Sequence, residues 1–396
     1  MKPLADRTDS RRQSNIRAIT LMLRDVDGIN LGQGICDMPT PEPIKRGAHA
    51  AIDGDKSIYS YYGGIHRLRE ALLDKARTYN RIPAKGIDDI MVTVGSTGAF
   101  VATMFTLLDP GDEVIVFEPY YGYHCNLLTV MGASLKFVRT KAPEWEIDFE
   151  KVESLITDRT KAIIVTTPNN PTGKVWSRKE LETMRDLLVK HDLYAITDEI
   201  YEYMLYDGHE HLSLASIEGA YDRTITLSGF SKTYNMTGWR LGYAVGPESI
   251  ISKMGLLADL IYICAPTPLQ YGVAEAFEMS DDYFQEMASA YDRKRTLMCT
   301  TLEEIGFNVP WPEGSYYVLA DFSPLRERFD GFEDDIAASR TLVERAGIGT
   351  VAGRSFFADD ADGDSCLRFC FAKEYDVLEE ACRRLKAAFA PISSES

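Results

Sequence analysis

The fold of this chain is decided by one stretch, Thr226-Leu-Ser-Gly-Phe-Ser-Lys-Thr-Tyr-Asn-Met-Thr-Gly-Trp-Arg-Leu-Gly-Tyr243. The apolar run 224–227 predicts a buried strand, and a turn of Ser and Gly follows it. Lys232 lies just after this turn, and Arg240 comes eight positions later. A lysine amine can form a Schiff base with an aldehyde, and a guanidinium can bind phosphate oxygens as a fork. The stretch therefore indicates a site for a phosphate-bearing aldehyde, although a lone lysine is most often a solvated surface residue.

The composition of the 396-residue chain is that of an ordinary globular protein, and its length favours two domains. Hydrophobic residues make up 45% of the chain and charged residues 26%. The formal net charge of −17 disfavours nucleic acid and anionic membranes as partners, because both need a basic face. No apolar stretch is long enough to cross a bilayer, and residues 1–7 lack the apolar core of a secretory signal.

The seven cysteines are odd in number, sparse and irregularly spaced, which favours free thiols in a reducing cytoplasm. Cys366 and Cys370 stand in an apolar run and are interpreted as packing residues. His209 and His211 could be two metal ligands, but no Cys or carboxylate cluster completes a recognisable set, so we expect no metal. The acidic residues 359–364 fail the calcium-loop spacing and are expected to form a solvated loop.

Apolar strands alternate with helical patterns through the middle of the chain. This alternation is typical of an α/β domain in which helices cover both faces of a mostly parallel sheet. The expected strands are residues 90–94, 113–117, 133–138, 161–166, 193–197, 224–227 and 242–245, and the expected helices between them include 99–108 and 178–191.

The two ends of the chain differ from this alternating pattern. We expect residues 1–45 to belong to a smaller domain, residues 46–284 to form the large domain, and residues 285–396 to complete the smaller one. The segments expected outside the alternation are helices at 16–23, 43–52, 65–79, 281–304, 336–346 and 374–389, an extended segment at 29–34, and strands at 316–320 and 365–371.

Polar residues stand just after several of the expected strands, where an open α/β sheet binds its ligands. Ser96, Thr97 and Gly98 begin a helix whose free amides could seat an anion, or they are simple caps. Tyr121 could stack on a flat heteroaromatic ring, or it packs in the core. Asn170 precedes a proline and is therefore extended, with an amide that can project, or it belongs to a plain turn.

Two charged residues stand in apolar surroundings that demand a partner. Asp198 ends a buried strand, where a carboxylate is costly unless a cation such as a protonated ring nitrogen pairs with it. The alternative is that Asp198 caps the segment that follows. Tyr201, three positions on, could bind a ring oxygen together with Asn170. Arg368 lies inside an apolar strand and needs either an internal acid or the α-carboxylate of a substrate.

These motifs together resemble the class I/II aminotransferases, which are pyridoxal-phosphate (PLP) enzymes of fold type I. The resemblance covers about 30–388, includes the Asn-Pro-Thr-Gly motif at 170–173, and is strongest from Asp198 to Gly246. It implies the α/β fold type I PLP-transferase architecture. In that fold a large domain has a mostly parallel sheet sandwiched by helices, and both termini form a smaller α+β domain.

The resemblance also implies roles for individual residues. Lys232 corresponds to the Schiff-base lysine that later carries a proton, Asp198 to the partner of the pyridine nitrogen, and Tyr121 to the stacking aromatic ring. Many relatives place a serine three residues before the lysine, where this chain has Gly229, so Ser228 is expected to make that phosphate contact instead. The other implied roles are ligands of the ring oxygen at Asn170 and Tyr201, a phosphate seat at Ser96, Thr97, Gly98 and Arg240, and substrate contacts at Gly34, Asn170 and Arg368.

Assembly and activity follow from the same resemblance. Tyr59 resembles the tyrosine that reaches the phosphate of the neighbouring subunit, which implies a homodimer with shared active sites. The implied activity moves an amino group from an L-amino acid to a 2-oxo acid through a Lys232 Schiff base, in ping-pong steps. The sequence looks most like the kynurenine, glutamine and aspartate/aromatic subgroup, and it does not fix the substrate side chain.

Two alternatives share this framework. A PLP-dependent C–S β-lyase would use nearly every residue named above. A PLP-sensing domain of a transcription regulator would carry an N-terminal DNA-binding domain, whereas here only about 30 residues precede the extended segment and the net charge is acidic.

Overall fold

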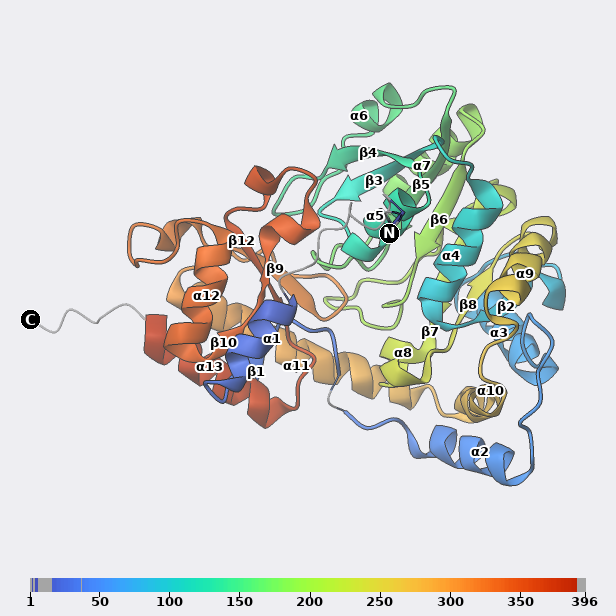
Figure 1. The fold of residues 1–396 in the computed structure, drawn as a ribbon, viewed down its shortest axis with the longest axis horizontal. Helices are drawn as coiled ribbons and strands as arrows, with labels where there is room; N and C mark the ends of the chain where they lie inside the picture. Colours follow the sequence, from blue (N-terminus) through green and yellow to red (C-terminus); the bar gives the residue numbers. More distant parts are fainter. Residues whose placement is uncertain (1, 3, 6–15, 37, 390–396) are drawn as a thin grey trace, which may run out of the picture.

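The computed structural model describes residues 2, 4–5, 16–36 and 38–389, and it places them in two lobes that lie side by side (Figure 1). The larger lobe contains the middle of the chain, and the smaller lobe contains the C-terminal elements together with helix α1 (Ile16–Arg24). Among the described residues, no helix combines the length and the apolar character needed to cross a lipid bilayer.

A seven-stranded sheet forms the centre of the larger lobe, in the order β2-β8-β7-β6-β5-β3-β4. Only β8 runs antiparallel to its neighbours, so the sheet is mostly parallel, as predicted. The strands are β2 (Ile90–Thr93), β3 (Glu113–Glu118), β4 (Ser134–Arg139), β5 (Thr160–Thr166), β6 (Tyr194–Asp198), β7 (Thr224–Gly229) and β8 (Gly242–Val245).

Helices cover both faces of this sheet because the strands are apolar on both sides. On β5, Ile164 packs into the cluster that contains α4 (Gly95–Leu107) and α9 (Glu248–Tyr262). Its neighbour Ile163 points to the opposite face and packs against α7 (Arg178–Lys190). The remaining helices of this lobe are α2 (Glu42–Asp53), α3 (His66–Thr78), α5 (Gly122–Val130), α6 (Phe149–Ser154), α8 (Phe230–Thr233) and α10 (Thr267–Ala274).

The smaller lobe is built around a three-stranded antiparallel sheet, in the order β11-β12-β9. A segment from the N-terminal part of the chain joins this lobe, because β1 (Ile29–Asn30) pairs in parallel with β10 (Ile348–Gly349). The other elements are β9 (Tyr317–Asp321), β11 (Val351–Ala352), β12 (Cys366–Cys370), α11 (Asp282–Ile305), α12 (Asp335–Ala346) and α13 (Tyr375–Phe389).

Most predicted elements occur within three residues of their predicted ends, and the exceptions have physical reasons. Helix α4 begins at Gly95, four residues before the predicted start, because small residues fill its first turn. Helices α9 and α10 were not predicted. In α9, Leu256 and Leu260 are exposed while Met254 is buried, so the polar/apolar periodicity of an amphipathic helix is missing. The predicted domain boundaries, after residues 45 and 284, fall inside α2 and α11, and the division itself stays a prediction.

Candidate active site

The predicted site residues gather at the carboxyl edge of the large sheet and where the smaller lobe meets it. Asp198 is the last residue of β6, and Lys232 lies in α8, directly after β7. Nζ of Lys232 donates a 2.9 Å hydrogen bond to the carbonyl oxygen of Gly34, which comes from the N-terminal segment. The interface of the two lobes therefore holds residues that are 198 positions apart in the sequence.

The environment of Lys232 favours a reactive amine. Burial lowers the pKa of Lys232 to about 8, and the positive charges of Arg368 and Arg240 act in the same direction. The thiols of Cys370 and Cys36 oppose this effect. A lysine with this pKa has a substantial neutral fraction near neutral pH, which a nucleophilic amine requires.

Asp198 is buried and paired with a residue that sequence reasoning missed. Its Oδ2 lies 3.0 Å from Nε2 of His124, and its Oδ1 accepts a 3.3 Å hydrogen bond from the backbone N–H of Ile200. The ring of His124 stacks on Phe100 at a centroid distance of 4.5 Å, which fixes its orientation. The signal that could have found His124 is its place three residues after Tyr121, at the same edge of the sheet.

The aromatic residues of the predicted site lie around this pair. The ring of Tyr121 meets the ring of His124 edge-on at 5.1 Å. The hydroxyl of Tyr201 donates to the hydroxyl of Tyr317 at 3.5 Å. Burial raises the pKa values of both Tyr121 and Tyr201, so both phenols stay protonated and can donate hydrogen bonds.

Arg368 is buried in β12, and none of the acidic residues that the structure describes forms an ion pair with it. Its Nη1 donates to Oδ1 of Asn170 at 2.8 Å, and its Nη2 donates to the carbonyl oxygen of Gly32 at 2.7 Å. Its Nε is buried without a hydrogen-bond partner, and no carboxylate in the described part of the chain pairs with the guanidinium. The rings of Tyr317 and Phe356 lie 4.2 Å and 5.0 Å from the guanidinium carbon. The predicted alternative of an internal ion pair is therefore not realised among these residues.

The start of α4 and the guanidinium of Arg240 lie close together at the predicted anion seat. The residue before the helix, Val94, gives no side-chain cap, so the first amides at Ser96 and Thr97 have no capping group. Gly95 has φ +68°, and a Cβ there would lie 2.5 Å from Nη2 of Arg240. Only glycine lets the guanidinium come this close to the helix terminus, and the pair suits a phosphate group.

The remaining two phosphate predictions have different outcomes. The hydroxyl of Ser228 is buried and donates to Oε1 of Glu202 at 2.9 Å, so it is engaged away from the anion seat. The expectation that Ser228 replaces the contact missing at Gly229 thus finds no support in the structure. Tyr59 is 75% exposed, so its side chain is available to a second subunit.

A buried charge cluster lies behind the turn that follows Asp198, and the sequence did not indicate it. The carboxylate of Glu202 binds Lys75 at 2.7 Å, and Nε2 of His211 lies 2.8 Å from Glu199. Burial alone would raise the pKa of Glu202, but Lys75 and the surrounding donors hold it below its usual value. The ligand atoms of Glu199, Glu202 and His211 lie within 4.8 Å of one another, yet Lys75 already supplies the cation.

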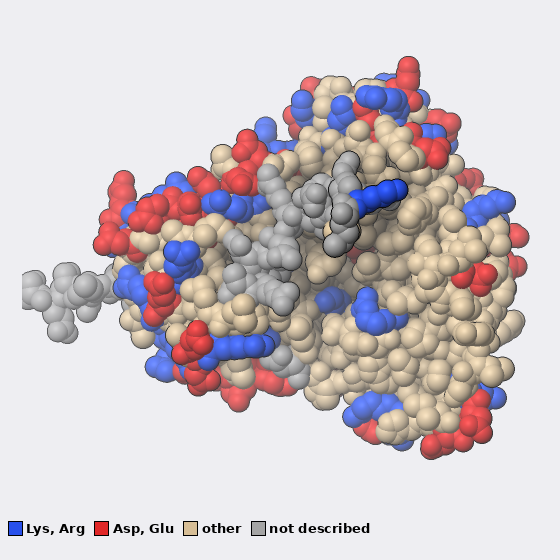
Figure 2. All heavy atoms as spheres, in the orientation of Figure 1, with Lys and Arg blue, Asp and Glu red and all other residues tan. Residues whose placement is uncertain are grey.

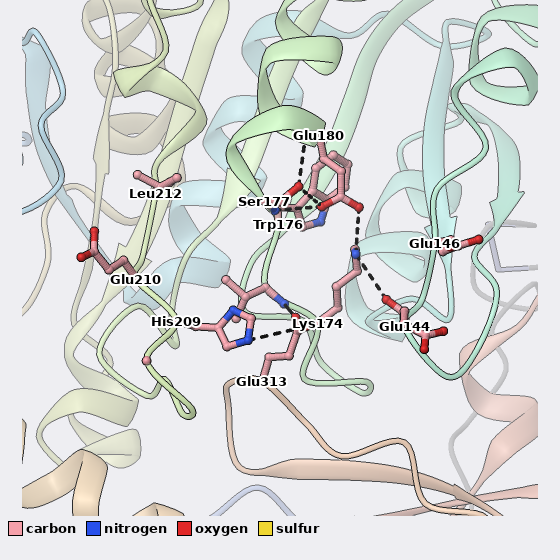
Figure 3. Close-up of a pocket in the computed structure, with 12 residues that line it drawn as sticks. Glu144, Glu146, Lys174, Trp176, Ser177, Glu180, His209, Glu210, Leu212 and Glu313 are labelled. Atoms are coloured by element: carbon pink, nitrogen blue, oxygen red, sulfur yellow. Dashed lines mark hydrogen bonds and ion pairs between the residues drawn. The ribbon is translucent and has the colours of Figure 1, made fainter.

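A separate cleft of about 590 Å³ lies beside the loop that follows Asn170 (Figure 3). None of the predicted site residues lines it. Its acids are engaged or exposed: Lys174 binds Glu180 at 2.8 Å, and His209 lies 3.7 Å from Glu313. A smaller pocket, lined by Tyr121 and His124, borders the predicted ring site instead.

Comparisons with known proteins identify the family of the chain. The family model "Aminotransferase class I and II" matches residues 26–385. The aromatic-amino-acid aminotransferase 2 of Thermococcus litoralis is 35% identical over 97% of both chains, and the aspartate/prephenate aminotransferase of Thermus thermophilus is 37% identical over 93% of both. The solved structure of N-succinyldiaminopimelate aminotransferase from Mycobacterium tuberculosis is 30% identical, covers 98% of this chain and all of that one, and superposes with a TM-score of 0.92.

The anion seat, the reactive lysine and the unpaired buried arginine fit a PLP cofactor and a carboxylate substrate, and the family match extends over nearly the whole chain. The chain belongs to the class I and II aminotransferases, and it is a PLP-dependent aminotransferase of fold type I.

Proposed function

We propose that this aminotransferase holds the α-carboxylate of its amino acid substrate on Arg368 and uses Lys232 as nucleophile and proton carrier. The observation that carries the proposal is the guanidinium of Arg368, which is buried with an unsatisfied Nε. A buried charge without a counter-charge is costly, and a substrate carboxylate would supply the missing anion in a bidentate geometry. PLP, when bound, supplies an aldehyde for amines and an electron sink for charge at Cα.

Lys232 is suited to both of its proposed tasks. Its pKa of about 8 leaves it able to attack as a neutral amine and also to hold a proton. Its amine binds the carbonyl oxygen of Gly34, and the guanidinium of Arg368 binds that of Gly32, so the same short segment holds the amine and the proposed carboxylate anchor. It can therefore take a proton from Cα and return it elsewhere without leaving the site.

Asp198 is proposed to pair with the protonated ring nitrogen, with His124 as its support. The bond from His124 fixes one carboxylate oxygen, and the backbone N–H of Ile200 fixes the other. A carboxylate held at both oxygens is preorganised for a cation that arrives with the cofactor. Tyr121 is proposed as the stacking ring, and Tyr201 with Asn170 as the donors to the ring oxygen.

The phosphate is proposed to lie on the first turn of α4, at Ser96, Thr97 and Gly98, with Arg240 as its counter-charge. The exposed face of Arg240 and its hydrogen bond to the carbonyl oxygen of Thr237, at 2.8 Å, support this assignment. The guanidinium is anchored at one nitrogen, and its other nitrogens remain for phosphate oxygens.

We also propose a homodimer in which Tyr59 reaches the partner's phosphate. The end of α9 exposes Leu260 at 83% and also Leu256 and Ile261, and Ile58 beside Tyr59 is 80% exposed. The face over α4, α9 and α10 carries few charged side chains (Figure 2). A patch of this kind on a protein with net charge −17 is typical of a subunit interface.

We also propose that the enzyme is cytoplasmic and that it does not bind nucleic acid. All seven cysteines are free, which supports a reducing, cytoplasmic location, and the acidic charge argues against nucleic acid as a partner.

The relatives are named for aromatic amino acids, aspartate and prephenate, and we propose donors from that range. The aromatic rings of Tyr317 and Phe356 beside Arg368 support this choice.

A donor panel tests the proposed function. Aspartate, glutamate and aromatic amino acids are each mixed with the loaded enzyme, first alone and then with 2-oxoglutarate, pyruvate or oxaloacetate. A donor alone should convert the visible spectrum of the cofactor to that of its amino form, and a 2-oxo acid should restore it. An enzyme that never makes this conversion, yet releases pyruvate and a thiol from cystathionine, would be a C–S β-lyase.

A further inference from the structure

Tyr316 has no role in the assignments above, yet its hydroxyl binds the same atom as Lys232. The hydroxyl donates to the carbonyl oxygen of Gly34 at 3.0 Å, and Nζ of Lys232 donates to that oxygen at 2.9 Å. A carbonyl oxygen has two lone pairs. Both acceptor positions of Gly34 are therefore used, one by the proposed nucleophile and one by this tyrosine.

The ring of Tyr316 is held rigidly. The residue is fully buried directly before β9, and its backbone carbonyl accepts from the N–H of Phe371 at 3.0 Å. The rings of Tyr201 and Tyr291 lie 5.1 Å and 5.8 Å from its centroid. Because the surrounding side chains close the space, the hydroxyl keeps one position.

Residues 32–36 contact both positively charged side chains of the proposed site, those of Arg368 and Lys232. Gly32 accepts from Arg368 through its carbonyl oxygen, and Gly34 accepts from Lys232 through its own. A Cβ on Gly34 would overlap the hydroxyl of Tyr317, so the backbone passes close to the aromatic cluster. The position of this segment thus affects both the carboxylate anchor and the amine.

We propose that Tyr316 is a positioning residue that clamps residues 32–36 and shares the Gly34 carbonyl with Lys232, so that it sets where the free amine rests and how strongly it is held. The inference rests on the proposed role of Lys232. Two donors on one carbonyl weaken each other's bond, so the phenol prevents this oxygen from holding the ammonium form of the lysine too tightly.

The test compares Tyr316→Phe with Tyr206→Phe as a matched control. Tyr206 is buried in the same apolar cluster as Tyr316 and also donates to a backbone carbonyl, but that carbonyl belongs to Ser315. With the cofactor in its amino form, Lys232 is a free amine. Its labelling by an amine-reactive reagent is then measured against pH by peptide mapping, beside kcat and KM for one donor.

In Tyr316→Phe, the Gly34 carbonyl accepts from Lys232 without competition, and this stabilises the ammonium form more than the neutral amine because a charged N–H is the stronger donor. The midpoint of the labelling curve should rise by roughly half a pH unit or more, since one neutral hydrogen bond is worth about that much. The groups that also face Lys232, namely Arg368, Arg240, Cys36 and Cys370, are unchanged, so they do not contribute to the difference. The value of kcat should fall about threefold to tenfold, and Tyr206→Phe should leave the midpoint where it is in the wild type.

An unmoved midpoint in Tyr316→Phe, or an equal rise in Tyr206→Phe, would overturn the role of Tyr316. Either result would leave the proposed function intact as long as the donor panel still shows transfer. Loss of the donor half-reaction in the wild-type enzyme would instead refute the proposed function itself.

Discussion

Nη1 of Arg368 donates a 2.8 Å hydrogen bond to Oδ1 of Asn170, and this bond links two parts of the proposed site. Asn170 is the expected ligand of the ring oxygen, and Arg368 is the expected anchor of the substrate carboxylate. An amide has one acceptor oxygen and a nitrogen with two donors. Because the oxygen is used by Arg368, the nitrogen remains free to donate to an anionic ring oxygen.

The first prediction uses this bond. Asn170→Asp would give Arg368 an internal anion of the same shape, which competes with the substrate carboxylate. We expect KM for the amino donor to rise about 10²-fold, within the range measured for buried charge pairs. Steady-state kinetics would check this, with Asn169→Asp as the control, because Oδ1 of Asn169 only accepts from Thr172. An unchanged KM in Asn170→Asp would show that Arg368 does not bind the substrate carboxylate.

The second prediction concerns Asp198. Asp198→Ala should retain the cofactor through its phosphate but lower kcat about 10²–10³-fold, because the ring nitrogen loses its preorganised counter-charge. His124→Ala should cause a smaller loss, since the carboxylate stays but is less well fixed. Cofactor content by absorbance and turnover by a coupled assay give the two numbers. Near-normal turnover in Asp198→Ala would mean that the residue only caps the turn at Ile200.

The third prediction concerns the buried pair of Lys75 and Glu202. Glu202→Gln leaves the ammonium of Lys75 buried without a counter-charge, which should destabilise the protein by about 3–5 kcal/mol. Replacing both residues by methionine should cost clearly less, because no unpaired charge remains. Chemical denaturation of the three proteins gives the comparison. A double variant less stable than Glu202→Gln would show that the pair contributes more than charge compensation.

The fourth prediction concerns the proposed dimer. An inactive Tyr59 variant and an inactive Lys232 variant should recover up to about a quarter of the wild-type activity when mixed and allowed to exchange subunits. Half of the dimers are then hybrids, and each hybrid has one intact site. Refolding the two variants separately before mixing is the control. A fully active monomer in sedimentation experiments would refute the shared site.

The sequence predicts those parts of the site that stand at the ends of strands. Asp198 and Lys232 each follow an apolar run that by itself predicts a strand. Because the strands are parallel, both residues are expected at the same edge of the sheet. The anion seat was also predictable, because small residues and Arg240 stand at recognisable places. Ser228 was expected to contact the phosphate, whereas its hydroxyl donates to Glu202, which stands 26 positions away and is suggested by no local pattern.

The residues that escaped prediction depend on long-range packing. His124 contacts Asp198 from helix α5, and Tyr316 reaches Gly34 across 282 positions of the chain. Glu202 and Lys75 are 127 positions apart, and the sequence around one residue gives no sign of the other. Such pairs have no local pattern, so only the folded backbone brings them together.

Reduction of the loaded enzyme with borohydride identifies the nucleophile, because it fixes the cofactor to the amine that holds it. We expect a single labelled peptide, with the label on Lys232, and no label in Lys232→Ala. The chain has other lysines with little exposure, among them the partly buried Lys75 and the buried Lys294. A stoichiometric label on either of these, with Lys232 unmodified, would contradict the assignment of the nucleophile and with it the arrangement proposed around Asp198 and Arg368.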